Sequence, residues 1–484
     1  MGNEFKNKFL YQAATSSAQL LLPLATYPYI TRILGPLNVG KINYIDFLCQ
    51  LFIIFASFGI PWYAVREVAV RRDNNIERSV FISEILVLNI CFSIVSILLF
   101  ILLMLLPGQN ISILHWLLII NILINPFSFD WYLQGVEAFR FAAIRNIIVR
   151  LCMVGCCFLL IKSQDDFTIY YGLFTAAAIV LSAITSYKVF KENRINFKEV
   201  SLKKHLRPLW HFFLTSSAIS LYIYFDTIIL KFLTNKDEIV GFYTTALKIV
   251  KIFLMFILTL GTVLMPRLSW LAGNNDTHKI NDHLNKLLQL IIIIAVPVGL
   301  GIFILSPEII NVVAGEKFTP AIPLLQILCF LPLVIGLSNL FCFQTLVPFN
   351  KEKKFLLVVI TGCIISIATN FLLTPKMGGA GAAFANLITE IIITVLSGIY
   401  ATKFANFKLH SSVIIQTVLT SVLFFPIVFI CRNLFYNPLI ILSTAISVCV
   451  VLYFIFQIWV FKNDTVIDIK NYLTNLLKLQ PKIK

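Results

Sequence analysis

The chain has 484 residues, of which 59% are hydrophobic and only 13% are charged, and its mean hydropathy is +0.89. Soluble domains are nearer half apolar and a quarter charged, so this composition excludes that class and indicates an integral membrane protein. The ten cysteines mostly lie within apolar runs and form no paired C-x-x-C spacing, so we expect no disulfide framework, metal site or cofactor.

Apolar runs that could cross a bilayer recur along the whole chain. A hydrocarbon core of about 30 Å requires roughly 20 apolar residues in a helix. The sequence therefore predicts an all-α integral membrane protein with about 14 transmembrane helices. The predicted spans are residues 9–33, 42–64, 80–106, 113–134, 141–161, 168–190, 208–232, 240–266, 285–305, 322–347, 355–374, 379–403, 411–431 and 438–461.

The lysines and arginines, 39 in number, orient these spans. Cationic connections are retained on the cytoplasmic side of a membrane, and most of the cations fall on one side when both termini are placed in the cytoplasm. We therefore expect a multi-pass protein with both termini cytoplasmic. The net charge of +16 then reflects topology and does not indicate nucleic-acid binding.

The heaviest basic cluster lies between the sixth and seventh predicted spans, where residues 187–207 carry seven cations. Such a segment is typical of a cytoplasmic connection between two halves. We expect an N-terminal six-helix lobe, a basic cytoplasmic linker, a C-terminal six-helix lobe, and two accessory helices with a basic tail. These parts correspond to residues 1–190, 191–207, 208–404 and 405–484.

A weak internal repeat supports two halves. Val-Gly opens the second span at Gly40 and the eighth span at Gly241, an offset of 201 residues. Arg66 and Arg267 each follow the corresponding glycine by 26 residues. Six spans separate equivalent helices, so the repeats are parallel and predict two lobes around a central cavity. Chance similarity among apolar helices is the alternative.

Three cations lie far from the ends of their predicted spans, at Arg150, Lys248 and Lys251. The two lysines are spaced i, i+3 on one helix face and lie about 12 and 16 Å from the outer end of their span. A lysine facing lipid there would cost about 2.5–3.5 kcal/mol, so we expect these side chains to face a wet cavity. An internal ion pair or a misplaced span boundary is the alternative.

Carboxylates at Asp46, Asp226, Glu390 and Asp130 also lie within predicted spans. Asp46 and Asp226 are in the outer third of their helices, Glu390 is near the middle, and Asp130 is near the cytoplasmic end. For Asp130 we expect a structural ion pair. The other three carboxylates could each pair with a nearby cation or bind H⁺ or Na⁺ as a coupling site.

Motifs of common enzymes are absent from the sequence. It contains no G-x-x-x-x-G-K-[ST] phosphate loop and no H-E-x-x-H, G-x-S-x-G or D-x-D pattern. The external connections are also short, the longest being residues 306–321. We therefore expect a protein that is not an enzyme.

Several stretches together carry a resemblance to a known family. The stretches are PYITRILGPLNVG (28–40), FGIPWYAVREVAVRRD (58–73), FDWYLQGVEAFRFAAIRN (129–146), YFDTIILKFLTNKDEIVGFYTTALKI (224–249) and GGAGAAFANLITE (378–390). In this order the sequence resembles the Wzx-type polysaccharide flippases of the multidrug/oligosaccharidyl-lipid/polysaccharide exporter superfamily. The resemblance implies a bacterial inner-membrane flippase that works by alternating access. It also implies that the transported lipid-linked repeat units are used to build O-antigen, capsule or exopolysaccharide.

The resemblance also implies a substrate and partners. The substrate is undecaprenyl-pyrophosphate carrying one oligosaccharide repeat unit, and the polysaccharide polymerase and chain-length regulator are the implied protein partners. Fixed cations are required to carry a pyrophosphate across a bilayer, and Arg32, Lys248, Lys251 and Arg150 are the candidates. Interfacial anchoring is the alternative role of Arg32.

Two rival functions stay open. A multidrug or cation antiporter of the same superfamily would share the fold but would be expected to have an acidic cavity. A membrane polysaccharide polymerase would be expected to have a large external loop.

Overall fold

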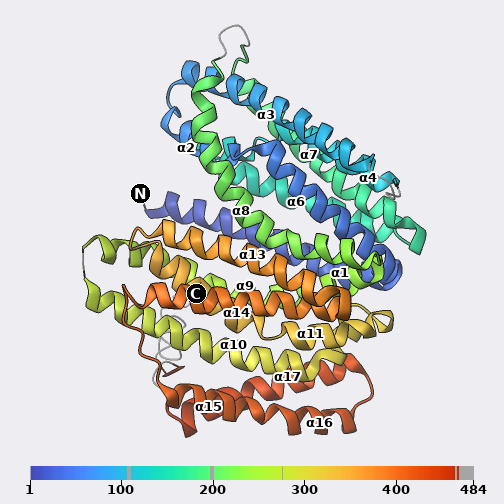
Figure 1. Ribbon diagram of the computed structural model, residues 1–484, viewed down its shortest axis with the longest axis vertical. Coiled ribbons are helices and arrows are strands. Elements are labelled where there is room, and N and C mark those ends of the chain that lie inside the picture. The colour runs from blue at the N-terminus through green and yellow to red at the C-terminus, as the bar shows by residue number, and fades with distance from the viewer. Residues whose placement is uncertain (1, 106–110, 197–200, 275, 464–465, 468–484) are drawn as a thin grey trace, which may run out of the picture. The chain divides into compact units, whose positions relative to one another are not determined.

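The computed structural model describes residues 2–105, 111–196, 201–274, 276–463 and 466–467. Within these ranges the regular elements are all helices and no β-strand occurs (Figure 1). The helices group into two compact units, Met1–Gly241 and Phe242–Lys484. The all-α prediction is therefore confirmed.

The described ranges contain 11 helices that are long and apolar enough to cross a membrane. A bent pair, Glu316–Leu328 with Leu331–Leu346, brings the number to 12 if it counts as one span. The predicted spans 9–33 and 208–232 lie along α1 (Gly2–Ser57) and α8 (Lys203–Thr234), whose side chains the structure describes only in part. The number of fourteen therefore stays a prediction.

The N-terminal unit is built around α1, which packs against α3, α6 and α8. Its core is an apolar cluster contributed by α2, α3, α5 and the start of α8, with Tyr63, Phe81, Tyr132 and Leu209 among its members. The remaining helices of the unit are α2 (Ile60–Val70), α3 (Asn75–Met104), α4 (Ile113–Ile124), α5 (Asp130–Gly135), α6 (Phe139–Leu160) and α7 (Phe167–Glu192).

Two backbone breaks divide the first part of the chain. Gly35 has φ 70° and ψ 173°, a left-handed backbone that glycine adopts without a steric penalty, and Pro36 then restarts the helix. Phe58 and Gly59 have φ of 43° and 77° and separate α1 from α2. The Phe58 ring is stacked between Phe92 and Phe213, each at 4.2 Å between ring centroids, which holds this residue in its unusual conformation.

The two glycines of the sequence repeat meet in the structure. A Cβ atom on Gly40 would lie 1.8 Å from the carbonyl oxygen of Asp237, and a Cβ atom on Gly241 would lie 2.1 Å from the carbonyl oxygen of Pro36. Each carbonyl belongs to the residue four positions before the opposite glycine, so the offset of 201 residues relates the two contacts. This approach of two backbones leaves no room for any side chain and supports the repeat.

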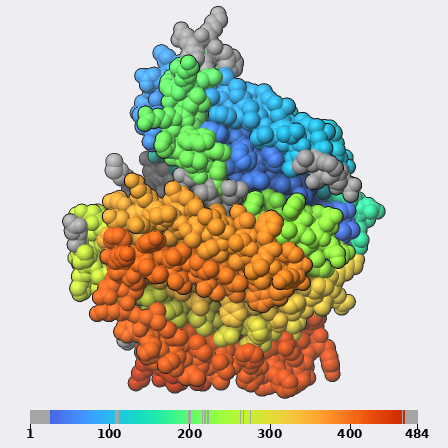
Figure 2. Space-filling view, viewed as in Figure 1, coloured from blue at the N-terminus to red at the C-terminus, as the bar shows by residue number. Residues whose placement is uncertain are grey.

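The C-terminal unit contains α10 (Thr277–Val313), which packs against α11, α12, α15, α16 and α17. Its other helices are α9 (Asp237–Gly273), whose first five residues belong to the N-terminal unit, α11 (Ile322–Leu328), α12 (Leu331–Phe341), α13 (Glu352–Met377), α14 (Gly379–Ala401), α15 (Ser411–Val422), α16 (Phe424–Leu434) and α17 (Pro438–Ile455). Figure 2 shows the side chains of this unit from α13 and α14 (orange) to the accessory helices (red). A Cβ on Gly381 would lie 2.4 Å from the carbonyl oxygen of Leu373, so the small residues that open α14 allow its close contact with α13.

The compact units and the sequence repeat divide the chain at different places. The repeat makes α8 the first helix of the second half, with the division predicted at residues 191–207. The contacts within the structure instead group α8 with the N-terminal unit, and the division falls after Gly241.

Candidate functional site

Arg150 occupies the middle of α6, eleven residues after the helix begins, or about 16 Å along it. Its side chain is half-buried, and its Nε is buried with no hydrogen-bond partner among the described residues. A buried donor without an acceptor costs about 1–3 kcal/mol and more for a charged group. Arg150 is therefore a cation in the membrane region whose hydrogen-bonding capacity the described residues leave partly unused.

Arg145, one and a half turns earlier on α6, shows the contrasting case. Its guanidinium contacts Asp130 at 2.5 Å and also donates to Asn146 and to the hydroxyl of Thr185. Arg145 is 5% exposed, so this network compensates the burial of its charge. The structural ion pair expected for Asp130 is present.

Asp46 and Asp226 lie on two helices of the N-terminal unit that pack antiparallel, α1 and α8. Phe47 contacts Tyr224 at 5.6 Å between ring centroids, and this register places the two carboxylate residues at a similar level. Asp226 is buried and Asp46 is half-buried.

The remaining predicted residues are divided between the units. Arg32 is exposed and precedes the break at Gly35 in the N-terminal unit. Lys248 and Lys251 are exposed along α9 in the C-terminal unit. Glu390 is 6% exposed on α14. The structure therefore groups Arg32, Asp46, Arg150 and Asp226 in one unit and Lys248, Lys251 and Glu390 in the other.

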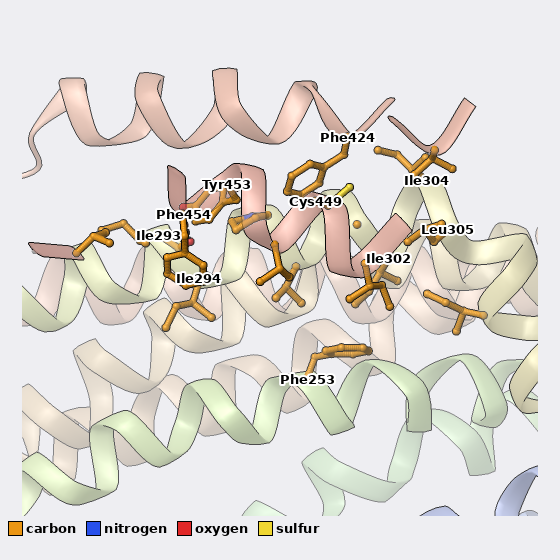
Figure 3. Close-up of a pocket in the computed structure, with 18 of the residues that line it drawn as sticks. Phe253, Ile293, Ile294, Ile302, Ile304, Leu305, Phe424, Cys449, Tyr453 and Phe454 are labelled. Atoms are coloured by element: carbon orange, nitrogen blue, oxygen red, sulfur yellow. Dashed lines mark hydrogen bonds between the residues drawn. The ribbon is translucent and has the colours of Figure 1, made fainter. Parts of the chain in front are cut away.

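An apolar groove runs through the C-terminal unit, and no sequence pattern indicates it. Its volume is about 420 Å³, and α9, α10, α16 and α17 supply almost all of its wall (Figure 3). Its described lining carries no charged side chain and extends along α10 from Leu290 to Ile309, about 28 Å, close to the thickness of a hydrocarbon core. At Gly301, no described atom lies within 4 Å of the position of a Cβ, so the groove is open there.

Two polar contacts fix the wall of this groove. The Tyr453 hydroxyl donates to the carbonyl oxygen of Ile293 at 2.7 Å. Near the end marked by Ile309, the Arg432 guanidinium binds both carboxylate oxygens of Glu308 at 2.6 and 2.9 Å, and it also donates to the carbonyl of Ile304. A bidentate pair of this kind fixes direction as well as distance, so it holds α16 against α10. No local pattern predicts this pair, because the partners are 124 residues apart.

Solved structures share this fold. The lipid II flippase MurJ, in an inward closed conformation, matches with a TM-score of 0.74 at 18% identity, covering 95% of this chain and all of that one. A multidrug resistance MATE family transporter of the MOP superfamily, in an inward-facing conformation, matches with a TM-score of 0.62 at 14% identity. That alignment covers 82% of this chain and 97% of the other. These similarities establish the fold.

Relatives in sequence carry the names of transporters and polysaccharide biosynthesis proteins, which indicates a transport protein and not an enzyme. A protein of Escherichia coli (strain K12) that is named as an O-antigen transporter is 26% identical over 396 residues, which are 81% of this chain and 95% of the relative. The lipopolysaccharide biosynthesis protein WzxC of the same organism is 28% identical over 241 residues, 45% of this chain and 47% of the relative.

A match to a sequence profile identifies the protein family. The profile described as polysaccharide biosynthesis protein matches residues 5–272, more than half of the 484 residues. This match agrees with the resemblance to Wzx-type flippases and with the fold of the exporter superfamily. The chain therefore belongs to the polysaccharide biosynthesis protein family.

Proposed function

We propose that the protein is a flippase that translocates undecaprenyl-pyrophosphate-linked oligosaccharide repeat units across the bacterial inner membrane, with both termini cytoplasmic. The family and the names of its relatives support a role in polysaccharide export. Transport by alternating access is the corresponding mechanism for two lobes built from parallel repeats. The polysaccharide polymerase and the chain-length regulator are the proposed protein partners.

The observation that carries the proposal is Arg150. A guanidinium in the middle of a membrane helix, with a buried Nε that has no acceptor among the described residues, suits an anionic group that enters from outside the fold. A pyrophosphate supplies the acceptor oxygens, and the resulting bonds would be charge-assisted. Arg32, Lys248 and Lys251 are proposed as further cations on its path, in the predicted central cavity.

The apolar groove supports a lipid-linked substrate. A polyprenyl chain has no polar groups, and the groove offers it a wall without charge over about 28 Å. The groove would thus accept part of the lipid tail while the cations interact with the pyrophosphate. The substrate has an anionic pyrophosphate and an apolar tail, and the protein has cations and an apolar groove that suit them.

Coupling to H⁺ or Na⁺ is proposed at Asp46, Asp226 and Glu390. Each carboxylate lies at membrane depth, where ionisable groups usually serve transport or pair internally. Replacement of each by its amide keeps the shape and removes the charge. We expect at least one such variant to lose translocation at normal protein abundance, and three fully active variants would contradict carboxylate coupling.

The central test replaces Arg150 and measures translocation of lipid-linked oligosaccharide in inverted membrane vesicles. Arg150→Ala should reduce the rate about ten-fold or more, because one hydrogen-bonded charge contact contributes about 1.5–3 kcal/mol. Arg150→Lys should retain part of the activity, since it keeps the charge but not the planar fork. The matched control is Arg140→Ala, which removes an exposed arginine of the same helix.

The outcomes separate substrate binding from folding. Removing Arg150 deletes an unsatisfied buried donor, so the amount of folded protein should not fall. Unchanged translocation in Arg150→Ala would contradict the proposed binding role. Efflux of cationic drugs by the intact protein, without translocation of the lipid-linked oligosaccharide, would favour the antiporter instead.

A further inference from the structure

The helix α10, which is long and apolar enough to cross a membrane, contains Pro297 in its interior. Proline has no N–H, so the carbonyl oxygen of Ile293, four residues earlier, lacks its usual partner within the helix. Hydrocarbon offers no donor, so another part of the protein must satisfy such a carbonyl. The Tyr453 hydroxyl of α17 donates to it at 2.7 Å, and both residues are buried (Figure 3).

The second proline inside α10 provides a contrast. Pro307 removes the usual partner of the Phe303 carbonyl, and the Ser306 hydroxyl of the same helix donates to that carbonyl at 3.0 Å. The break at Pro307 is therefore satisfied locally. The break at Pro297 instead uses a donor that lies 160 residues away from Ile293 in the chain, so it joins two helices.

The same part of α10 is packed tightly against the turn between α11 and α12. A Cβ on Gly299 would lie 2.9 Å from the carbonyl oxygen of Cys329 in that turn. The two backbones are therefore in direct contact only two residues beyond Pro297. Because this contact leaves little room for displacement, the Ile293 carbonyl is a fixed point for α17 to bind.

The end of α17 that carries Tyr453 has a further polar contact in its next turn. Gln457 is fully buried, and its side chain donates to the hydroxyl of Thr420 on α15 at 3.3 Å. Earlier in α17, Ile446 and Val450 line the groove with apolar side chains. One end of α17 is thus held by directional contacts, and the preceding part contributes apolar wall.

The width of the groove depends on how closely α17 approaches α10. Apolar contacts have no fixed direction, so alone they would let α17 move toward α10 or away from it. A hydrogen bond has a defined length and direction. We propose that Tyr453 is a positioning residue, which anchors α17 to the carbonyl freed by Pro297 and so sets the width of the groove for a polyprenyl chain. This inference rests on the proposed function, because it concerns how the same groove receives the lipid tail.

An exchange of hydrogen-bond donors tests this anchor. Tyr453→Phe removes the hydroxyl but keeps the ring, so the Ile293 carbonyl loses its donor from α17. Pro297→Ala supplies a backbone N–H that reaches the same carbonyl within α10. The double variant therefore satisfies the carbonyl without attaching α17. The matched control combines Tyr453→Phe with Pro307→Ala, which supplies a donor to a different carbonyl.

Three measurements follow these variants. Thermal unfolding in detergent reports stability. Labelling of Cys449 by N-ethylmaleimide reports access to the groove, because Cys449 lines it and is 6% exposed; the other cysteines are replaced for this purpose. A protein that keeps only Cys157 of α6, which is 1% exposed, provides the labelling control. Translocation of lipid-linked oligosaccharide in inverted vesicles reports transport.

We expect Tyr453→Phe to lower the unfolding midpoint by about 2–4 °C. Labelling of Cys449 should become faster and translocation slower, each by about two- to ten-fold, the change expected for one hydrogen bond. In the Pro297→Ala background the effect of Tyr453→Phe on the midpoint should vanish, while its effects on labelling and translocation should keep the same factors. In the Pro307→Ala background all three effects should persist. The labelling rate of Cys157 should not change.

The opposite outcomes would overturn the anchor. If Pro297→Ala also abolished the effects of Tyr453→Phe on labelling and translocation, Tyr453 would serve only to satisfy the backbone. Unchanged labelling or normal translocation in Tyr453→Phe would contradict the positioning role directly. Equal recovery of the midpoint in the Pro307→Ala background would contradict the role of the Ile293 carbonyl. Absence of translocation in the unchanged protein would refute the proposed function, while the midpoint and the labelling rate would still decide whether Tyr453 anchors α17.

Discussion

The contacts that stabilise the interior of the N-terminal unit differ from those within the C-terminal unit. In the N-terminal unit, charged and polar side chains join helices far apart in sequence, as in the Glu84–His205 and Asp130–Arg145 pairs. Within the described ranges of the C-terminal unit, Arg432 and Glu308 form an ion pair between distant helices, and an apolar groove lies beside them. Both units also have apolar cores and hydrogen bonds between distant helices, so the difference among the described residues lies in the ion pairs and in the groove.

This difference affects what each unit can do. Directional contacts with buried partners allow few alternative arrangements, because every displacement leaves a charge unpaired. Apolar surfaces can separate and repack around a flexible chain at lower cost, since dispersion and hydrophobic contacts have no fixed direction. The N-terminal unit is thus suited to act as a rigid body, and the C-terminal unit is suited to accept a lipid chain.

We expect the largest effect from a substitution at the closest backbone contact of the N-terminal unit. Gly40→Val introduces atoms where only 1.8 Å separates a Cβ from a carbonyl oxygen, and we expect a loss of about 3 kcal/mol or more of stability. Gly241→Val should be nearly as severe. Thermal unfolding in detergent, followed by labelling of buried cysteines, measures this loss. Gly155→Val is the control because no described atom lies within 4 Å of its Cβ position, and equal loss there would refute the explanation.

The second prediction sharpens the role of the groove. Gly301→Phe fills open space without a backbone clash and should lower translocation several-fold. Stability should be unchanged or raised, because glycine is a poor helix former. Gly155→Phe adds the same ring to an exposed site on α6 and should leave translocation unaffected. Normal translocation by Gly301→Phe would contradict binding of the lipid tail in the groove.

The third prediction removes the charged bridge of the C-terminal unit. Arg432→Ala leaves Glu308 without its bidentate partner and should lower the free energy of unfolding by about 1–3 kcal/mol. We expect a value in the lower part of this range, because Arg432 is partly exposed to solvent. The double variant Arg432→Met with Glu308→Leu should recover much of the loss, since it leaves no unpaired charge. Thermal unfolding compares the single and double variants. A double variant less stable than Arg432→Ala would show that the charges themselves are required.

The smallest expected effect is a pH dependence in the N-terminal unit. Burial lowers the pKa of His205, against the opposing influence of the Glu84 carboxylate, while Lys204 and Arg71 add to the lowering. Tyr63 is the remaining group in contact with the imidazole. The unfolded chain, with a histidine pKa of about 6.5, then binds more protons than the folded protein just below that pH.

The contribution of His205 to the free energy of unfolding should accordingly be fully present above about pH 6.5. It should be lost as the pH falls through the pKa of His205 in the folded protein. The slope is at most about 1.4 kcal/mol per pH unit for one group. His205→Gln should reduce this slope between about pH 5.5 and 7, where a free glutamate is largely ionised. Unfolding midpoints over that range provide the measurement. An unchanged slope in the variant would assign the effect to another group.

The sequence predicts those features that depend on local pattern. Helical class, membrane location and the positions of most spans follow from apolar run length, and the Asp130 pair follows from a charge placed where lipid would penalise it. The contact between Gly40 and Gly241 joins the two positions that the predicted repeat relates by a fixed offset. Each of these signals is contained in a few consecutive residues or in one spacing.

Features that depend on tertiary contact could not be predicted in this way. Arg432 and Glu308 are 124 residues apart and lie at helix ends, where a charge is unremarkable in sequence. The groove consists of ordinary apolar residues, and only the packing of α16 and α17 on α10 leaves space between them. The contacts of α8 with α1 and α2 group it with the N-terminal unit, whereas the repeat indicated the other half.

The crossing of Gly40 and Gly241 also limits how this protein can vary in evolution. Most tight contacts can drift, because a larger residue on one side is balanced by a smaller one on the other. Here each position faces backbone, and no residue is smaller than glycine, so neither change has a compensating partner. We therefore expect the pair to be nearly invariant among close relatives and to give no covariation signal. Methods that infer contacts from correlated substitutions would miss the tightest contact described in the N-terminal unit.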